Sequence, residues 1–238
     1  MPAPGPGTNN PMNDEPQYIR EVNLEVRDSL TLIVERVPRG SEVLELGTAT
    51  GYLGRFLGEQ WDCTVDGVEL IEDMAGVARP AYRRLVVADL EEKPLREHFP
   101  AGGYDTVICA DVLEHLYNPA AIIAQIEGML KPGGRLVVSV PNIAYAGLIM
   151  DLIDGNFEYS ELGLLDRTHI RFFTRATVTR MIEEQGFRIT DADVVHWPFE
   201  QSEFYQRLRD RPLPLKNYLF ARPDGDVYQF ILVAEPAG

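Results

Sequence analysis

The stretch VLELGTATGYL, residues 43–53, decides the fold of this chain. An apolar run of strand length leads through small residues into a segment with helical spacing. Small side chains in such a turn let a ligand approach the backbone closely, and the following helix presents unpaired N–H groups at its start. A glycine-rich turn of this kind also serves dinucleotides and tight packing, so its ligand must be identified from motifs further along the chain.

Short apolar runs alternate with helical patterns on both sides of this turn. Strands are predicted at residues 42–46, 64–70, 85–88, 106–110, 135–140, 187–196 and 227–234. Strands separated by helices imply right-handed crossovers and a mostly parallel sheet that is covered on both faces. The sequence therefore predicts an α/β fold: a Rossmann-like, doubly wound, mostly parallel sheet of seven strands with helices on both faces.

Four segments interrupt or precede this alternation. Residues 1–16 are rich in Pro, Gly and Asn and cannot repay the entropy of ordering, so they are predicted to be a flexible tail. A helix over residues 17–37 is predicted to lead into a single domain that spans residues 17–238. The regular pattern lapses over residues 143–173 and 198–216, and irregular stretches of this kind are where we expect acceptor lids.

Charge and composition exclude several classes of function. The chain has 238 residues with 22 basic and 37 acidic side chains, a formal charge of −15, which disfavours a nucleic-acid partner. A basic cluster around His169, between Arg167 and Arg180, leaves a local anion site open. No stretch approaches the ~20 apolar residues of a membrane span, and the first residues lack a signal-peptide pattern. We therefore expect a cytoplasmic protein with no membrane span.

Two acidic residues stand where the second and third predicted strands end. Glu69 can accept hydrogen bonds from both hydroxyls of a ribose, and Asp89 can accept from an adenine amino group. A dinucleotide-binding dehydrogenase is the competing interpretation of the glycine-rich turn. Its G-x-G-x-x-G fingerprint is not satisfied. Ala49 occupies the position of the middle glycine, and Gly54 does not fall on a glycine position of the pattern.

In this order, the motifs resemble those of the class I S-adenosylmethionine-dependent methyltransferases. The acidic residue and the small residues of that family's first motif are matched by Glu45, Gly47, Ala49 and Gly51. The family more often has Gly where this chain has Ala49, and an Ala fits there if its φ is negative. The runs YDTVICADVLEHL, residues 104–116, and LKPGGRL, residues 130–136, resemble the family's fourth- and fifth-strand motifs.

The resemblance spans about residues 40–195 and implies S-adenosylmethionine as the cofactor, with S-adenosylhomocysteine as its product. It implies a cofactor site formed by Glu45, Gly47, Thr48, Ala49, Gly51, Glu69, Leu70, Asp89, Leu90, Ala110 and Asp111.

Methyl transfer from a sulfonium requires a positioned acceptor and, for a hydroxyl, a base that removes its proton. His115 follows the fourth predicted strand, and His169 lies in LLDRTHIRFFT, residues 164–174, which resembles a run in bacterial methyltransferases of cell-surface sugar and secondary-metabolite pathways. We predict that His115, His169 and Glu114 are catalytic and that the two histidines converge on the acceptor. Purely structural roles stay open: His115 could be a partly buried histidine with satisfied hydrogen bonds, and His169 could belong to a loop that only packs on the sheet.

The spacing Asp-x-x-Glu-His, residues 111–115, would put Asp111, Glu114 and His115 on one face of a helical turn. It also resembles a segment of ubiquinone-pathway O-methyltransferases and of small-RNA terminal ribose methyltransferases, in which a divalent metal is held together with a later His. That resemblance implies a metal site formed by Asp111, Glu114, His115 and His169. Such ligands suit Mg²⁺, Mn²⁺ or Fe²⁺. We favour a metal-free base over this metal site.

The leading hypothesis is O-methylation of a small hydroxylated acceptor, such as a sugar, a phenol or a natural-product intermediate. N-methylation of an amino sugar or metabolite is the nearest alternative, since an amine needs a weaker base. A catalytically silent methyltransferase fold that acts as a binding partner is an alternative of a different class. RNA ribose methylation is disfavoured by the net charge. A homodimer is left open.

Overall fold

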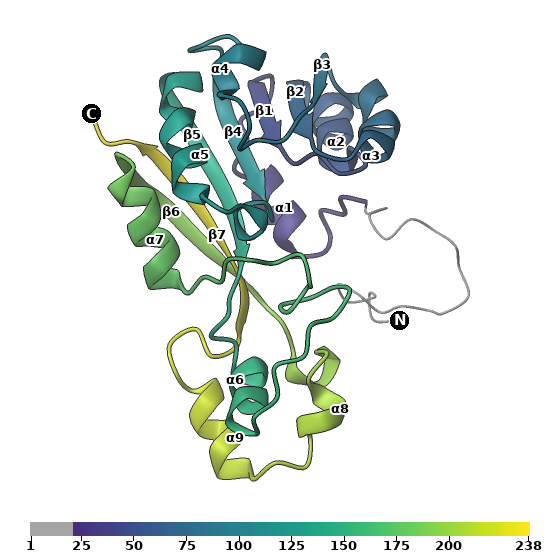
Figure 1. Ribbon diagram of the computed structural model, residues 1–238, viewed down its shortest axis with the longest axis vertical. Coiled ribbons are helices and arrows are strands. Elements are labelled where there is room, and N and C mark those ends of the chain that lie inside the picture. Colours follow the sequence, from purple (N-terminus) through teal and green to yellow (C-terminus); the bar gives the residue numbers. More distant parts are fainter. Residues whose placement is uncertain (1–20) are drawn as a thin grey trace.

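The computed structural model describes residues 21–238 and contains the predicted seven-stranded sheet (Figure 1). The strand order is β3-β2-β1-β4-β5-β7-β6; β7 runs antiparallel to β5 and β6, and the other pairs are parallel. The strands are β1 (Glu42–Leu46), β2 (Thr64–Glu69), β3 (Arg84–Val87), β4 (Tyr104–Ala110), β5 (Leu130–Pro141), β6 (Phe187–His196) and β7 (Val227–Pro236). The predicted strands are thus confirmed, with shifts of a few residues at their ends.

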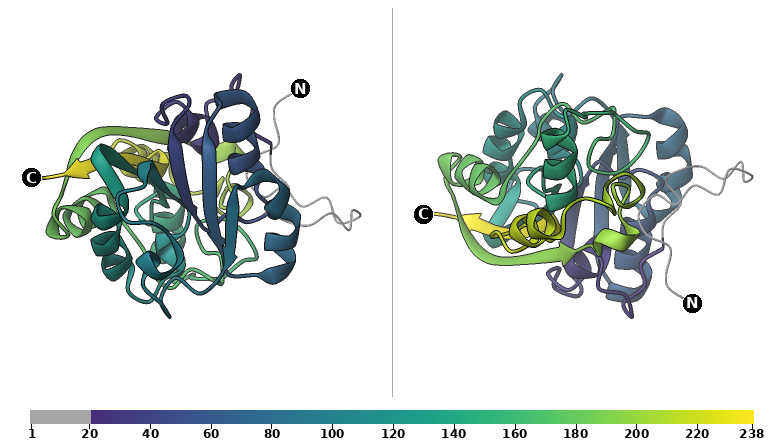
Figure 2. Two further views of the ribbon diagram at one scale, coloured as in Figure 1. Left: turned by 90° about the horizontal axis from the view of Figure 1, so that it is seen from above. Right: turned by 90° about the horizontal axis from the view of Figure 1, so that it is seen from below.

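Helices cover both faces of this sheet, as the two end-on views show (Figure 2). The helices of the sheet domain are α1 (Ser29–Val34), α2 (Tyr52–Trp61), α3 (Glu72–Ala78), α4 (Leu95–His98), α5 (Pro119–Ile126) and α7 (Arg175–Glu184). One core cluster joins the sheet to α1, α2 and α3, and a second joins it to α4, α5 and α7. The predicted doubly wound architecture is therefore confirmed.

Strand β1 shows why the central strands read as continuous apolar runs. Val43 packs in the cluster with α2, whereas Leu44 and Leu46 pack in the cluster with α5. Successive side chains of a strand point to opposite faces, and here both faces are buried. The same alternation directs Glu45 to the side of α2, where it is buried.

The helix predicted over residues 17–37 is much shorter than expected. Within the described residues it is limited to α1, which begins where the Asp28 carboxylate accepts a hydrogen bond from the Thr31 backbone N–H at 2.9 Å. The Asn23 side chain accepts from Glu25 in the same way. Such local side-chain bonds compete with helix formation, so the apolar spacing alone did not extend the helix to residues before Ser29. The predicted tail, residues 1–16, lies outside the described residues.

The two stretches predicted to be irregular carry short helices instead. They are α6 (Ala146–Ile153), α8 (Tyr205–Leu208), α9 (Leu213–Phe220) and the 3-10 turn η4 (Phe199–Gln201). Together with residues 154–173 they form what we call the helical lobe, below the sheet in Figure 1. The lobe has its own apolar cluster, which includes Tyr145, Leu164, Phe204 and Tyr228. Short amphipathic segments therefore fold here because they pack on one another.

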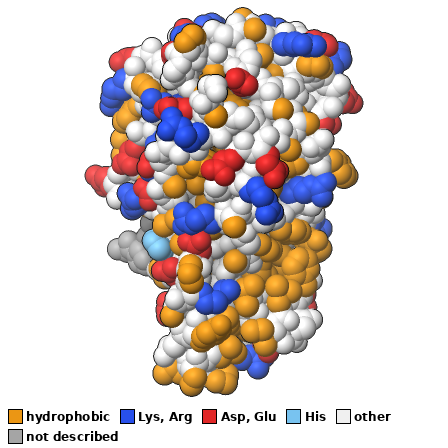
Figure 3. All heavy atoms as spheres, turned by 90° about the vertical axis from the view of Figure 1, so that its left-hand side faces the viewer, with side chains coloured by type: hydrophobic (Ala, Val, Ile, Leu, Met, Phe, Trp, Pro, Cys, Tyr) orange, Lys and Arg blue, Asp and Glu red, His pale blue; other side chains and the backbone are white. Residues whose placement is uncertain are grey.

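The surface of the lobe is more apolar than that of the sheet domain on the face drawn in Figure 3. Its large exposed apolar side chains include Leu152 and Ile153 of α6 and Leu213 and Tyr218 of α9. In residues 21–238, no helix combines the length and the apolar character that crossing a membrane requires.

Candidate active site

The glycine-rich turn follows β1 at the carboxyl edge of the sheet. Gly47 and Gly51 have φ angles of 75° and 79°, in the left-handed region that favours glycine. A Cβ at Gly47 would lie 2.6 Å from a methyl carbon of Val112, so the turn is also packed tightly. Ala49 has a φ of 47°, and our expectation of a negative angle is wrong. The turn needs left-handed backbone at this position too, at a cost of about 1–2 kcal/mol for a non-glycine residue.

Glu69 ends β2 directly beside this turn. One carboxylate oxygen accepts from the Ala49 backbone N–H at 2.7 Å, and the other accepts from the Ile71 N–H at 2.9 Å. The side chain is only 6% exposed. Each carboxylate oxygen can accept a second hydrogen bond, so Glu69 can hold the turn and still accept from hydroxyls of a ligand.

Glu45 lies beneath the turn and not on its open side. Its carboxyl group accepts a hydrogen bond from the Tyr82 hydroxyl at 2.7 Å, and both side chains are buried. Burial, and to a lesser extent the nearby Glu69, raises the pKa of Glu45 to about 8, although the Tyr82 bond lowers it. Sequence reasoning missed Tyr82, because no motif links it to residue 45.

The other predicted cofactor residues lie at the same edge of the sheet. Leu70 follows β2, Asp89 and Leu90 follow β3, and Ala110 ends β4. Thr48 is buried in the turn, and its hydroxyl has no hydrogen-bond partner within residues 21–238. Ligands of doubly wound sheets bind at this carboxyl edge, so the structure brings the predicted set together.

Asp111 is held by two residues that the sequence did not indicate. Its carboxylate accepts from the Ser139 hydroxyl at 2.8 Å and from the side-chain amide of Gln229 on β7. Its φ of 54° is left-handed, so the predicted helical turn over 111–115 is wrong. Only Leu113–His115 forms a turn, of the 3-10 type. Asp111 therefore faces β5 and β7, on a different backbone geometry from Glu114.

Glu114, His115 and His169 come together as predicted. The two imidazole rings have centroids 4.8 Å apart at an angle of 68°, and one potential ligand atom from each of the three residues lies within 4.8 Å of the others. The segment after β4 and the segment that carries His169 lie side by side, because the backbone N–H groups of Ile170 and Arg171 both donate to the Glu114 carbonyl at 2.9 Å. We call these three residues the Glu-His-His cluster.

Backbone carbonyls orient both rings. Nδ1 of His115 lies 3.2 Å from the Thr168 carbonyl oxygen, and Nδ1 of His169 lies 3.2 Å from the Leu164 carbonyl oxygen. A carbonyl oxygen only accepts, so a hydrogen bond here requires Nδ1 to carry the proton. In the neutral rings, Nε2 is then left as the basic nitrogen of each histidine.

Burial disfavours the charged forms of Glu114 and His169. Glu114 is 1% exposed, and neither of its carboxyl oxygens has a hydrogen-bond partner among residues 21–238. Its pKa is raised well above the usual range, first by burial and then by Asp111 and Asp166. Burial, and next the neighbouring His115, lowers the pKa of His169. Nε2 of His169 lies 4.0 Å from Glu114. The same three side chains offer a carboxylate and two imidazoles to a divalent metal.

The basic cluster around His169 is largely engaged within the protein. Arg167 pairs with Glu161, Arg175 pairs with Asp224, and Arg171 donates to the Tyr117 carbonyl. The sequence left an anion site open here, and these contacts neutralise or occupy three of its cations.

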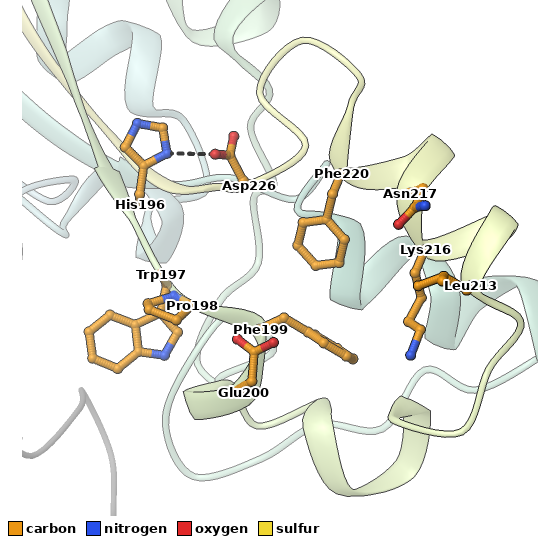
Figure 4. Close-up of a pocket in the computed structure, with 10 residues that line it drawn as sticks. All are labelled: His196, Trp197, Pro198, Phe199, Glu200, Leu213, Lys216, Asn217, Phe220 and Asp226. Atoms are coloured by element: carbon orange, nitrogen blue, oxygen red, sulfur yellow. Dashed lines mark ion pairs between the residues drawn. The ribbon is translucent and has the colours of Figure 1, made fainter.

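A pocket of about 480 Å³ lies in the helical lobe, between the end of β6 and α9 (Figure 4). Phe199 and Phe220 form apolar walls, and His196 pairs with Asp226 at 3.0 Å at one side. None of the predicted site residues lines this pocket. It therefore does not share its walls with the Glu-His-His cluster.

Comparison with known proteins finds curated relatives and solved structures of similar architecture. A ubiquinone biosynthesis O-methyltransferase of Aeromonas salmonicida (strain A449) is 27% identical over 168 residues, which cover 69% of this chain and 70% of the relative. One of Xylella fastidiosa (strain 9a5c) is 28% identical over 193 residues, covering 76% and 74%. The crystal structure of a methyltransferase candidate from Bacillus halodurans C-125 matches with a TM-score of 0.61 at 20% identity, covering 87% of this chain and 97% of that one.

The methyltransferase domain family matches residues 18–192, which is more than half of the chain. Within that match lie the turn after β1, the acidic end of β2 and the Glu-His-His cluster. The chain therefore belongs to the methyltransferase domain family and is a class I S-adenosylmethionine-dependent methyltransferase, with S-adenosylmethionine as its cofactor.

Proposed function

We propose that this enzyme O-methylates a small hydroxylated acceptor, such as a sugar, a phenol or a natural-product intermediate, at the Glu-His-His cluster. The observation that carries the proposal is the convergence of two imidazoles, each with Nδ1 on a backbone carbonyl and Nε2 left basic. A hydroxyl acceptor must lose its proton during transfer, and a neutral imidazole takes it at cellular pH.

The roles of the chain's own residues follow from their positions. The turn at residues 47–51 and Glu69 bind the cofactor, which supplies an electrophilic methyl carbon on its sulfonium. His115 or His169 accepts the acceptor's proton at Nε2. Burial raises the pKa of Glu114 well above its usual range, and in its protonated form Glu114 can donate its O–H to the acceptor oxygen or to the second ring. The helical lobe orients the acceptor and excludes water from the transfer.

N-methylation is the less favoured alternative for this site. An amine acceptor has only to lose the proton of its ammonium form, which would not require two imidazoles and a buried carboxyl group in one place. The relatives from Aeromonas and Xylella are named as O-methyltransferases, which supports the hydroxyl acceptor. The charge of −15 supports a small molecule rather than RNA.

A divalent metal bound by Glu114, His115 and His169 is the second candidate mechanism. The observation that favours it is the buried Glu114 carboxyl group, whose two oxygens lack partners among residues 21–238. An unpaired buried carboxyl group costs free energy, and a cation would offset that cost. The metal would polarise the acceptor hydroxyl, and both imidazoles would then serve as ligands instead of bases.

The proposed reaction is tested with methyl-labelled S-adenosylmethionine and a fractionated metabolite extract. Label in a small product whose methyl carbon has the chemical shift of an ether supports O-methylation; an N-methyl shift contradicts it. Turnover that survives a chelator supports the metal-free base. Loss of turnover with chelator, restored by Mg²⁺, Mn²⁺ or Fe²⁺, establishes the metal mechanism. Cofactor binding without transfer to any fraction would favour the catalytically silent alternative.

A further inference from the structure

Tyr82 fills a socket that three glycines create around the cofactor turn. A Cβ built on Gly54 would lie 2.3 Å from the Cζ of Tyr82, and one on Gly67 would lie 2.9 Å from its Cε1. A Cβ on Gly51 would lie 3.1 Å from its Cε2. These glycines come from the turn, from α2 and from β2. The ring of Tyr82 therefore occupies the space that their missing side chains leave.

The hydroxyl of Tyr82 adds a polar contact at the bottom of this socket. It donates to the Glu45 carboxyl group at 2.7 Å, and both side chains are almost inaccessible to solvent. Tyr82 itself follows the 3-10 turn Arg79–Ala81, and its backbone N–H donates to the Arg79 carbonyl. One side chain thus links the segment after α3 to the end of β1, the start of α2 and the middle of β2.

We propose that Tyr82 is a positioning residue for S-adenosylmethionine: its ring and hydroxyl hold the turn at residues 47–51 in the conformation that accepts the cofactor. It acts through Gly51, on which its ring packs, and through Glu45, to which its hydroxyl is bonded. The inference rests on the proposed placement of the cofactor at this turn. It adds a residue that lies in none of the motifs by which the cofactor site was predicted.

The ionisation of Glu45 supplies a readout that a purely structural tyrosine would not affect. The charged or titratable groups that influence Glu45 are the Tyr82 hydroxyl, which lowers its pKa, and the Glu69 carboxylate, which raises it. Above pH 8 the buried Glu45 becomes an anion beneath the turn that Glu69 also contacts. The affinity for the cofactor should therefore depend on pH near 8, and loss of the Tyr82 hydroxyl should move that dependence to higher pH.

The first test compares Tyr82→Phe with Tyr104→Phe by calorimetric binding of S-adenosylhomocysteine from pH 6.5 to about 9. Tyr104 is a matched control, because it is a buried tyrosine whose hydroxyl donates to the Asp66 carboxylate, also at 2.7 Å. It begins β4, at the end of that strand away from the cofactor turn. Tyr82→Phe should weaken binding roughly tenfold at neutral pH and shift the pH dependence upward, as expected for the loss of one buried hydrogen bond. Tyr104→Phe should change only the melting temperature.

The second test uses two glycines of the same helix. Gly54→Ala should displace the Tyr82 ring and weaken S-adenosylhomocysteine binding by more than Tyr82→Phe does. In Gly58→Ala, the new Cβ would meet only the Cys63 carbonyl, at 3.9 Å, so binding should stay unchanged while helix propensity raises stability.

The outcomes separate this inference from the proposed cofactor site. If Glu69→Ala leaves S-adenosylhomocysteine affinity unchanged, the placement of the cofactor at this turn is wrong. If Glu69→Ala weakens binding but folded Tyr82→Phe protein binds with wild-type affinity and pH dependence, the positioning role of Tyr82 is overturned. Weaker binding with a shifted pH dependence in Tyr82→Phe, and neither change in Tyr104→Phe, supports the proposal.

Discussion

His115 and His169 stand with their rings 4.8 Å apart, and each is oriented by a backbone carbonyl at its Nδ1. His115 is exposed, whereas His169 is buried and has a lowered pKa. The first ring is open to approach from solvent, whereas burial disfavours the charged form of the second. For this reason we expect His115, rather than His169, to meet the acceptor first.

The histidine pair leads to a prediction for turnover. His115→Ala and His169→Ala should each lower kcat about 10²–10⁴-fold, the usual contribution of a general base, while S-adenosylhomocysteine affinity stays nearly unchanged. His98→Ala is the control, because His98 ends α4, outside both the Glu-His-His cluster and the helical lobe. Full activity in either cluster variant would remove that ring from the mechanism.

Glu69 leads to a prediction for cofactor binding. Glu69→Ala removes the acceptor of the Ala49 N–H as well as the predicted ribose contacts, so binding should weaken by about 1.5–3 kcal/mol. Calorimetry with S-adenosylhomocysteine measures the change, and a normal melting curve shows that the variant is folded. Glu72→Ala, at an exposed carboxylate just after β2, should bind as the wild type does.

The raised pKa of Glu45 leads to a prediction for stability. Its pKa rises from 4.5 to about 8 on folding, so the unfolded chain ionises first as the pH increases. Stability is fully present below pH 4.5, falls between pH 4.5 and 8, and reaches its lower level above pH 8. Glu45→Gln cannot ionise and should lack this part of the decline. Equal pH slopes for the melting temperatures of the two proteins would contradict the raised pKa.

The left-handed backbone at Ala49 leads to a prediction for stability: unlike most substitutions, Ala49→Gly should raise the free energy of unfolding. Ala49→Gly relieves about 1–2 kcal/mol of strain and loses about 0.5–1 kcal/mol through the greater freedom of the unfolded chain. Denaturant unfolding should therefore show a gain of up to about 1.5 kcal/mol. Ala75→Gly, in the buried middle of α3, should lose stability in the same measurement. A loss at both positions would show that residue 49 is not strained.

The strands and the order of the motifs were predictable, because both depend on residues that are close together in the sequence. The apolar runs of β1 and β4 and the crossovers between strands led to the doubly wound sheet, which the structure confirms. The order of small and acidic residues up to Glu69 led to the cofactor and the family, which the family match confirms. The apolar spacing of residues 17–37 was misleading, because Asn23 and Asp28 bind the nearby backbone and delay the helix.

The sequence by itself determined the fold class, the cofactor and the identity of the two candidate histidines, since strand periodicity and motif spacing are properties of the chain. Only the tertiary structure decided what each side chain contacts. It placed Tyr82 on Glu45, and it turned Asp111 toward Ser139 and Gln229. The reason is physical: burial and close packing depend on segments that are distant in the chain, and a sequence read locally contains neither their distances nor the desolvation that shifts a pKa.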